Sequence, residues 1–191
     1  MGKDSIYDGF IIIFSLHDGE SSLILRKRRR NVVANEEKKD FNAMLLENKN
    51  MPKIKIITDS ASIKKYSGER MYFAPPADYD AVMRMVPFGK VTTVGEIRSF
   101  FARKNNADFT DPITAGIFVS IAAWASHQRT ADQTPYWRTL KAGGELNPKY
   151  PGGVEEQKKR LEDEGHTIVT KGRTRLRYVV KDYEAALYRP M

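Results

Sequence analysis

One twenty-residue stretch in the C-terminal half of the chain holds the residues best suited to form a binding site. It begins with the run 134–140, Thr-Pro-Tyr-Trp-Arg-Thr-Leu, and returns through a glycine-rich run at 143–153. A loop rich in turn residues that also carries two large aromatics, Tyr136 and Trp137, is typical of a pocket wall. The same rings also fit a simpler role, in which they anchor a surface loop to the core. Composition leaves both interpretations open.

The residue types that the sequence lacks exclude several kinds of chemistry. The chain has no cysteine, which rules out disulfides, thiolate metal sites and a cysteine nucleophile. Its three histidines, His17, His127 and His166, are far apart in the sequence, so we expect no histidine metal cluster. We therefore predict no metal, no cofactor and no catalytic residue.

The charge of the chain points to an acidic partner. The formal net charge is +8 over 191 residues, and nucleic acid is the commonest acidic partner of such proteins. Plain solubility is the competing explanation. The apolar run Phe10–Phe14 is far too short to cross a membrane, and no signal-peptide cleavage pattern follows it. We expect a cytoplasmic protein with no membrane partner.

The elements that must position the aromatic loop divide the chain into three parts. Residues 1–50 read as an extension that need not be folded, with a short hairpin expected at 10–25 and a basic block at Arg26–Arg30. Residues 51–77 form a lead-in with two short strands, at 54–57 and 71–73. The compact domain is expected at 78–191.

Helix signals are dense in the predicted domain. Asp78 suits the N-cap of a helix at 79–86. Thr93 and Glu96 form a capping box that opens a helix ending near residue 105. Asp111 and the proline after it open another helix, which continues to about residue 127 with apolar residues at helical spacing. Two helices joined in this way indicate a helix-turn-helix core, although the stretch between them is long for that motif.

A basic hairpin is expected after the aromatic loop and its helix at 154–164. Two strand-like runs, 166–170 and 176–180, flank a tip with four basic residues, Lys171, Arg173, Arg175 and Arg177. Helices followed by a basic hairpin predict a mainly α fold with a small β hairpin, of the winged-helix type. The tip fits a contact with phosphates, and an edge strand kept soluble by its charge is an equal alternative.

With these residues identified, the chain resembles the DNA-binding domain of O6-alkylguanine-DNA alkyltransferases, and most of all their cysteine-less relatives, the alkyltransferase-like proteins. The similarity spans about 78–183. It rests on three ordered motifs: Val86–Ile97, the Pro-Tyr-Trp-Arg run at 135–138, and the segment from Asn147 to Gly165. The chain also resembles a branch of small proteins that carry the Thr-Pro-Tyr-Trp-Arg sequence.

The resemblance implies a binding protein in place of an alkyl acceptor. True alkyltransferases carry Pro-Cys-His-Arg, in which a thiolate takes the alkyl group with help from the histidine and a glutamate. In this chain Tyr136 matches the cysteine, Trp137 the histidine and Glu164 the glutamate. A phenol with an ordinary pKa near 10 is a poor nucleophile, so the usual alkyl transfer is excluded. Without a thiol to activate, Glu164 is expected to serve as a hydrogen-bonding group at a helix end.

The cysteine-less relatives bind alkylated guanine flipped into a pocket, which gives two sets of expected site residues. The base pocket would be lined by Tyr136, Trp137, Lys149 and Glu164, with Lys149 in the place of a pocket-edge arginine. The helix at 112–127 would contact double-stranded DNA in the minor groove of the DNA. The residues expected to contact DNA are Thr92, Thr93, Thr114, Ser120, Arg138, Lys141, Lys171 and Arg173.

Two positions depart from the family pattern. The tyrosine that rotates a phosphate falls at Val94, and the intercalating arginine falls near Val119. A valine fits into a base stack as an apolar wedge but does not pair with the orphaned base.

The leading hypothesis is a non-enzymatic, alkyltransferase-like DNA-binding protein that works beside other repair proteins. One alternative is a module for protein or small ligands that keeps the fold without DNA binding. A new enzyme that uses Tyr136 or Glu164 is the third, and it requires a strongly perturbed pKa.

Overall fold

The computed structural model describes residues 38–191, except 49 and 175. The chain divides into two units, Met1–Lys39 and Asp40–Met191, and nearly all of the described residues belong to the second. The hairpin expected at 10–25, the basic block Arg26–Arg30 and the tip residue Arg175 lie outside the described residues.

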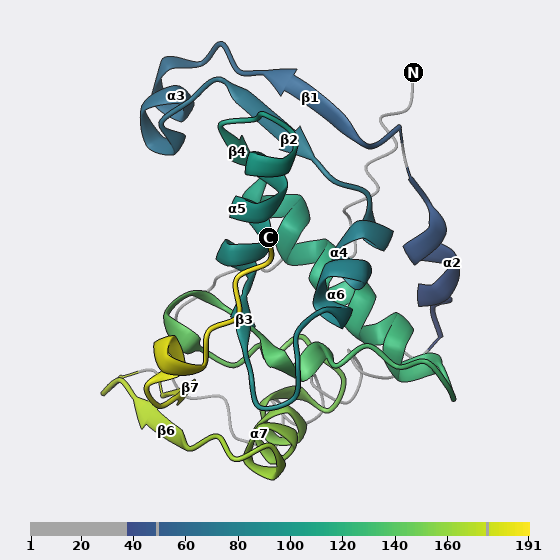
Figure 1. The fold of residues 1–191 in the computed structure, drawn as a ribbon, viewed down its shortest axis with the longest axis vertical. Coiled ribbons are helices and arrows are strands. Elements are labelled where there is room, and N and C mark those ends of the chain that lie inside the picture. Colours follow the sequence, from purple (N-terminus) through teal and green to yellow (C-terminus); the bar gives the residue numbers. More distant parts are fainter. Residues whose placement is uncertain (1–37, 49, 175) are drawn as a thin grey trace, which may run out of the picture. The chain divides into compact units, whose positions relative to one another are not determined.

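The second unit is rich in helices and has small sheets (Figure 1). Its helices are α2 (Phe41–Leu46), α3 (Ser60–Tyr66), α4 (Pro76–Arg84), α5 (Val94–Lys104), α6 (Pro112–Gln128) and α7 (Gly153–Asp163). Short 3-10 turns are η1 (Tyr136–Arg138), η2 (Ala142–Gly144) and η3 (Tyr183–Ala186). The strands are β1 (Lys53–Ile56), β2 (Arg70–Phe73), β3 (Thr92–Thr93), β4 (Phe109–Thr110), β5 (Thr139–Leu140), β6 (Ile168–Lys171) and β7 (Arg177–Val180).

Three small sheets connect segments that are far apart in the sequence. Strand β2 pairs antiparallel with β1 and parallel with β4. Strands β3 and β5 pair in parallel, so α5 and η2 follow the same ends of the two strands. Strands β6 and β7 form the expected antiparallel hairpin, with Ile168 opposite Val180 and Lys171 opposite Arg177.

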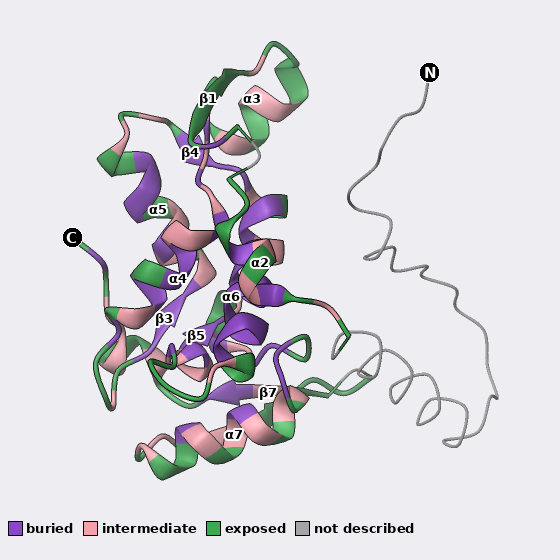
Figure 2. Cartoon of the chain, turned by 90° about the vertical axis from the view of Figure 1, so that its right-hand side faces the viewer, coloured by how far each residue is buried: buried purple, intermediate pink, exposed green. Residues whose placement is uncertain are grey.

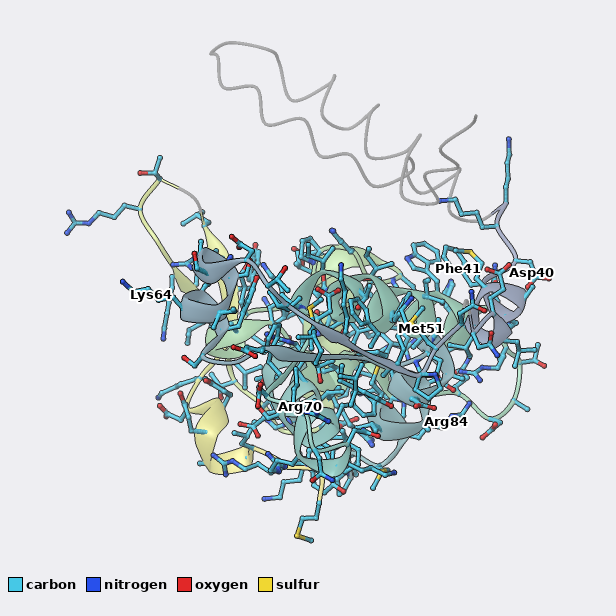
Figure 3. The ribbon with its side chains drawn as sticks, turned by 90° about the horizontal axis from the view of Figure 1, so that it is seen from above. Asp40, Phe41, Met51, Lys64, Arg70 and Arg84 are labelled. Carbon is cyan, nitrogen blue, oxygen red and sulfur yellow. The ribbon has the colours of Figure 1, made fainter. Side chains whose placement is uncertain are left out.

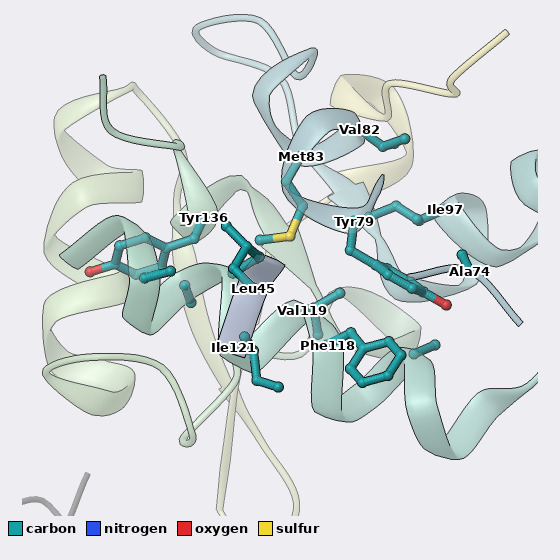
Figure 4. Close-up of a cluster of buried hydrophobic side chains, with 14 of the residues drawn as sticks. Leu45, Ala74, Tyr79, Val82, Met83, Ile97, Phe118, Val119, Ile121 and Tyr136 are labelled. Atoms are coloured by element: carbon teal, nitrogen blue, oxygen red, sulfur yellow. The ribbon is translucent and has the colours of Figure 1, made fainter. Parts of the chain in front are cut away.

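Helix α6 forms the centre of the core. It is apolar on nearly every side, and residues from Phe118 to Ser126 are all buried. It packs against α4, α5 and α2. Tyr79 of α4 contacts Phe118 of α6 edge-to-face, with ring centroids 5.8 Å apart (Figure 4). A helix that is apolar on nearly every side is typical of a protein core.

The N-terminal caps predicted for α5 and α6 are confirmed. The Thr93 hydroxyl accepts a hydrogen bond from the Glu96 amide at 3.1 Å, and the Asp111 carboxylate accepts one from the Thr114 amide at 2.7 Å. The long stretch between the two helices contains β4, which joins the sheet of β2, so the connection is not a tight turn. Helix α4 starts earlier than expected, at Pro76, and Asp78 lies in its first turn instead of capping it.

The segment just before residue 51 belongs to the core, although we expected an extension up to residue 50. Phe41 and Leu45 of α2 retain only 1% and 6% of their exposure. The Phe41 ring stacks on Trp124 of α6 at 5.6 Å, and its amide donates to Gln128 at 3.0 Å. Two apolar residues four positions apart are a weak signal in a polar stretch, and α6 supplies the surface that makes them bury.

Candidate functional site

A buried carboxylate fixes the start of the aromatic loop. Asp80 of α4 forms ion pairs with Arg84 at 2.9 Å and Arg129 at 3.0 Å, and accepts a hydrogen bond from the Thr134 hydroxyl. Burial alone would raise the pKa of Asp80, but the hydrogen bonds from Arg129, Thr134 and Arg84 hold it below its ordinary value. The Thr134 amide also donates to Ser126 of α6 at 2.8 Å. The loop therefore leaves α6 in a fixed direction.

The three sequence motifs that carry the resemblance meet at one side chain, Glu164. Its carboxylate accepts hydrogen bonds from the indole nitrogen of Trp137 at 2.6 Å and from the Gly89 amide at 3.1 Å. The Arg138 guanidinium reaches both carboxylate oxygens at 2.9 Å and also donates to the Val86 carbonyl at 2.7 Å. The expectation that Glu164 serves as a hydrogen-bonding group at a helix end is confirmed, because it is the C-terminal cap residue of α7.

Charge pairing controls the protonation state of Glu164. Burial would raise its pKa, but the hydrogen bonds from Arg138, Trp137 and Gly89 lower it below the ordinary value of 4.5. The carboxylate is therefore ionised at neutral pH and balances the Arg138 charge. An acceptor that is already saturated with donors is not available as a general base.

Gln157, on the same face of α7 as Glu164, also binds the aromatic loop. The side chain of Gln157 is buried, donates to the Trp137 carbonyl at 3.0 Å and accepts from the Asn147 amide at 2.7 Å. Gln157 was not among the site residues predicted from the sequence. Its spacing was the available signal, because residues 157, 161 and 164 share one helix face.

Tyr136, which we expected to line a base pocket, is buried among other aromatic side chains. It retains 2% of its exposure, and its ring packs edge-to-face against Trp137 at 5.4 Å and Tyr150 at 5.5 Å. It lies at one end of the core cluster, with its hydroxyl directed away from that cluster (Figure 4). Burial raises the pKa of Tyr136, so the phenol stays neutral at pH 7 and is no nucleophile. Its hydroxyl has no hydrogen-bond partner among the described residues.

Trp137 and Lys149 are two further residues that we expected in the base pocket. The Arg160 guanidinium covers the Trp137 ring at 4.6 Å, a cation–π contact that the sequence did not reveal. Lys149 is exposed, and its carbonyl accepts a hydrogen bond from Trp124 of α6 at 3.0 Å. Two clefts lie elsewhere, one of about 360 Å³ beside α5 and β4 and one of about 400 Å³ between α4 and α5. Neither is lined by an expected pocket residue.

Most of the residues expected to contact DNA are withdrawn from solvent. Four are buried, with 0 to 8% exposure: Thr92, Thr93, Thr114 and Ser120. Arg138 has its guanidinium occupied by Glu164 and Val86, and its side chain keeps 14% exposure. Three of the expected contacts remain at the surface: Lys141, which pairs with Glu145 at 2.6 Å, Lys171 and Arg173.

The wedge expected near Val119 is not available. Val119 is fully buried, because α6 is covered on nearly every side. The first turns of α6 are the open part of the helix: Ile113 is 70% exposed, and a Cβ built on Gly116 would meet no atom within 4 Å. Val94, in the place of the family tyrosine, is partly buried against the core.

The described part of the chain holds no group of three or more acidic or histidine side chains placed to bind a metal ion. No helix within residues 38–191 is both long and apolar enough to cross a bilayer.

The chain was compared with protein families, curated proteins and solved structures. No protein-family model matches the chain, and no curated protein does. Among solved structures, the chain is similar to Atl1 of S. pombe in complex with damaged DNA containing O6-carboxymethylguanine, and to S. pombe ATL in complex with DNA. Each match has 22% sequence identity and covers 60% of this chain and 94% of the other, with TM-scores of 0.42 and 0.44.

Proposed function

We propose that this chain is a non-enzymatic protein that binds double-stranded DNA. The observation that carries the proposal is the convergence at Glu164. Gly89 lies 75 residues before Glu164 in the sequence, and Trp137 and Arg138 lie 27 and 26 residues before it, yet both motif segments reach the same carboxylate. Side chains that resemble the alkyltransferase motifs in sequence order thus also form one connected unit in space, which supports the family resemblance.

Charge supports DNA as the partner. The β6–β7 hairpin exposes Lys171, Arg173 and Arg177, and the chain carries a net charge of +8. Exposed cations on a hairpin tip contact phosphates without reading sequence. Affinity from such contacts falls steeply with salt, because each neutralised phosphate releases counterions. We therefore propose the hairpin, and not Arg138 or the buried threonines, as the main phosphate-binding element.

The chemistry of the loop supports binding without catalysis. The sequence supplies no thiol, and the phenol at the cysteine position is buried with a raised pKa. Glu164 is ionised and saturated with donors. Neither candidate group of an enzyme hypothesis has the environment that a nucleophile or a general base requires.

We further propose that the chain recognises alkylated guanine, as the resemblance implies. This recognition requires a change in the structure. A flipped base needs an empty, stacked pocket. The Tyr136 ring occupies this space between Trp137 and Tyr150, so a base would enter only after that ring is displaced. The proposed resting state binds duplex DNA without a flipped base. A repair setting with further repair proteins and an intracellular location follow from this proposal.

The second candidate function is a module that binds a protein or small ligand and no longer binds DNA. The withdrawal of Arg138, Thr92 and Thr93 from the surface favours it. The two candidates differ in how they respond to salt, since only DNA binding depends on phosphate neutralisation.

Fluorescence anisotropy with two matched duplexes tests the proposal. One duplex carries guanine and the other O6-methylguanine at the same position, and both are titrated at two salt concentrations. Salt-sensitive binding of either duplex supports DNA binding, and a preference for the modified duplex adds damage recognition. No binding to either duplex at low salt overturns the proposal and leaves the second candidate.

A further inference from the structure

The outer edge of the three-stranded sheet is a second surface that the DNA proposal does not use. In this sheet β2 lies between β1 and β4, so β1 is an edge strand (Figure 1). Every residue of β1 is exposed, as its green ribbon shows in Figure 2. Among the described residues, no strand pairs with the outer side of β1.

The register fixes which backbone groups face outward. The Ile57 amide donates to the Glu69 carbonyl at 2.8 Å, which makes this a hydrogen-bonded pair of the antiparallel ladder. Hydrogen-bonded pairs recur at every second residue, so Lys55 and Lys53 direct their N–H and C=O groups toward β2. The N–H and C=O groups of Ile54 and Ile56 therefore point to the open edge, ready for another strand.

The side chains of β1 alternate between the two faces of the sheet. Ile54 lies opposite Tyr72, whose ring packs against Phe101 in the core, so the isoleucines share the core-facing side of the sheet. Ile54 and Ile56 nevertheless remain 39% and 53% exposed. They are an apolar border of the core that the described residues leave partly open, and an added strand would extend the core over them.

The opposite face carries charge. Lys53 and Lys55 lie on it, and the neighbouring helix α3 adds Lys64 and Lys65, of which Lys64 is labelled in Figure 3. Between residues 50 and 73 the acidic side chains are Asp59 and Glu69, and Asp59 caps α3. Within the described part of the chain, none of the four lysines forms an ion pair.

We propose that the free edge of β1 binds an extended acidic segment of a partner protein by adding it to the sheet as a strand. Main-chain hydrogen bonds to Ile54 and Ile56 would supply affinity, and side chains alternating between apolar and carboxylate would supply specificity. A second copy of this chain is the poorer occupant. Antiparallel pairing of two β1 strands places lysines opposite lysines, which is destabilising.

The test uses a fluorescein-labelled peptide of about ten residues in which glutamate and valine alternate, a typical strand length. A matched peptide carries lysine in place of glutamate. Saturable binding of the glutamate peptide, at least about tenfold tighter than the lysine peptide, is the expected result. Reversing two charges, Lys53→Glu with Lys55→Glu, should reverse the preference.

Position 56 gives a matched pair of variants. Ile56→Pro removes the outward N–H but leaves the ladder to β2 intact, because proline is tolerated where the N–H faces solvent on an edge strand. Ile56→Thr keeps that N–H. We expect Ile56→Pro to lower the peptide affinity at least about tenfold and Ile56→Thr to lower it much less. Unchanged melting temperatures show that both variants fold.

Hydrogen exchange locates the bound peptide and separates it from simple charge attraction. The amides of Ile54 and Ile56 should exchange fast in the free protein and slowly in the complex, whereas the Lys55 amide is slow in both. Lys171→Ala with Arg173→Ala should leave peptide binding unchanged, so this result is independent of DNA binding. Absence of peptide binding, equal binding by the two position-56 variants, or protection confined to other segments overturns the proposal.

Discussion

The indole nitrogen of Trp137 lies 2.6 Å from a carboxylate oxygen of Glu164, and the Arg138 guanidinium holds both oxygens of the same carboxylate. In the family that the chain resembles, these positions belong to a histidine and a glutamate that help a thiolate react. In this chain they form a closed, charge-balanced contact. The arrangement holds the loop to the end of α7 and occupies both oxygens of the Glu164 carboxylate.

Neutralising Glu164 should therefore cost stability. In Glu164→Gln the Arg138 charge stays largely buried without its counter-charge, and breaking a buried pair from one side costs about 3 to 5 kcal/mol. Urea unfolding at pH 7 measures the loss. Asp163→Asn, at an exposed neighbouring acid of α7, is the control and should change stability by less than about 0.5 kcal/mol. Equal effects of the two variants would contradict the importance of this contact.

The same carboxylate should make stability depend on pH. The folded pKa of Glu164 is lowered below its ordinary value of 4.5, so the pair contributes fully above pH 4.5. The contribution is lost as the pH falls through the lowered folded pKa, when the carboxylate takes a proton. Urea unfolding between pH 3 and pH 7 should show a smaller acid loss in Glu164→Gln than in the wild type, on the order of 1 kcal/mol or more. Parallel pH profiles would show that Glu164 is not the group responsible.

Arg138→Lys separates the two roles that have been considered for Arg138. Lysine keeps the charge but loses the planar fork that reaches Glu164 and Val86 together, so stability should fall by about 2 kcal/mol. Affinity for DNA, measured under conditions in which the variant is folded, should be unchanged. The exposed Arg173→Lys serves as the control and should be close to neutral in stability. A stable Arg138→Lys variant with weakened DNA binding would return Arg138 to the phosphate-contacting set.

Removing the Tyr136 hydroxyl should be harmless to folding. It is buried and has no hydrogen-bond partner among the described residues, so Tyr136→Phe should change stability by less than about 1 kcal/mol or increase it. Tyr136→Ala, which deletes the ring, should cost about 3 to 5 kcal/mol through the cavity it leaves. Thermal or urea unfolding distinguishes the two. A loss of about 2 kcal/mol or more in Tyr136→Phe would reveal a hydroxyl partner.

The parts of the fold that follow from short-range signals were predictable. The caps of α5 and α6 and the β6–β7 hairpin depend on residues within a few positions of one another, such as Thr93 with Glu96 and Asp111 with Pro112. Helix α2 was not predictable, because Phe41 and Leu45 bury only when α6 provides a surface.

The candidate site was predicted as a set of residues but not as a geometry. The resemblance placed Tyr136, Trp137 and Glu164 together, and the structure brings them into one cluster. Whether a side chain points to solvent or inward depends on long-range packing. The direction of Arg138 is set by Glu164 and Val86, and the burial of Val119 by helices on several sides of α6. No local pattern encodes those neighbours.

The salt dependence of DNA binding tests the central claim most directly. The slope of log affinity against log salt is measured by anisotropy from about 50 to 200 mM salt for the wild type and two double variants. Lys171→Ala with Arg173→Ala should weaken binding and flatten the slope by about 2, roughly 0.9 for each lost phosphate contact. Lys64→Ala with Lys65→Ala removes the same charge from α3 and should leave the slope unchanged. Absence of wild-type binding at the lowest salt, or equal slopes for the two double variants, would contradict a hairpin that binds DNA.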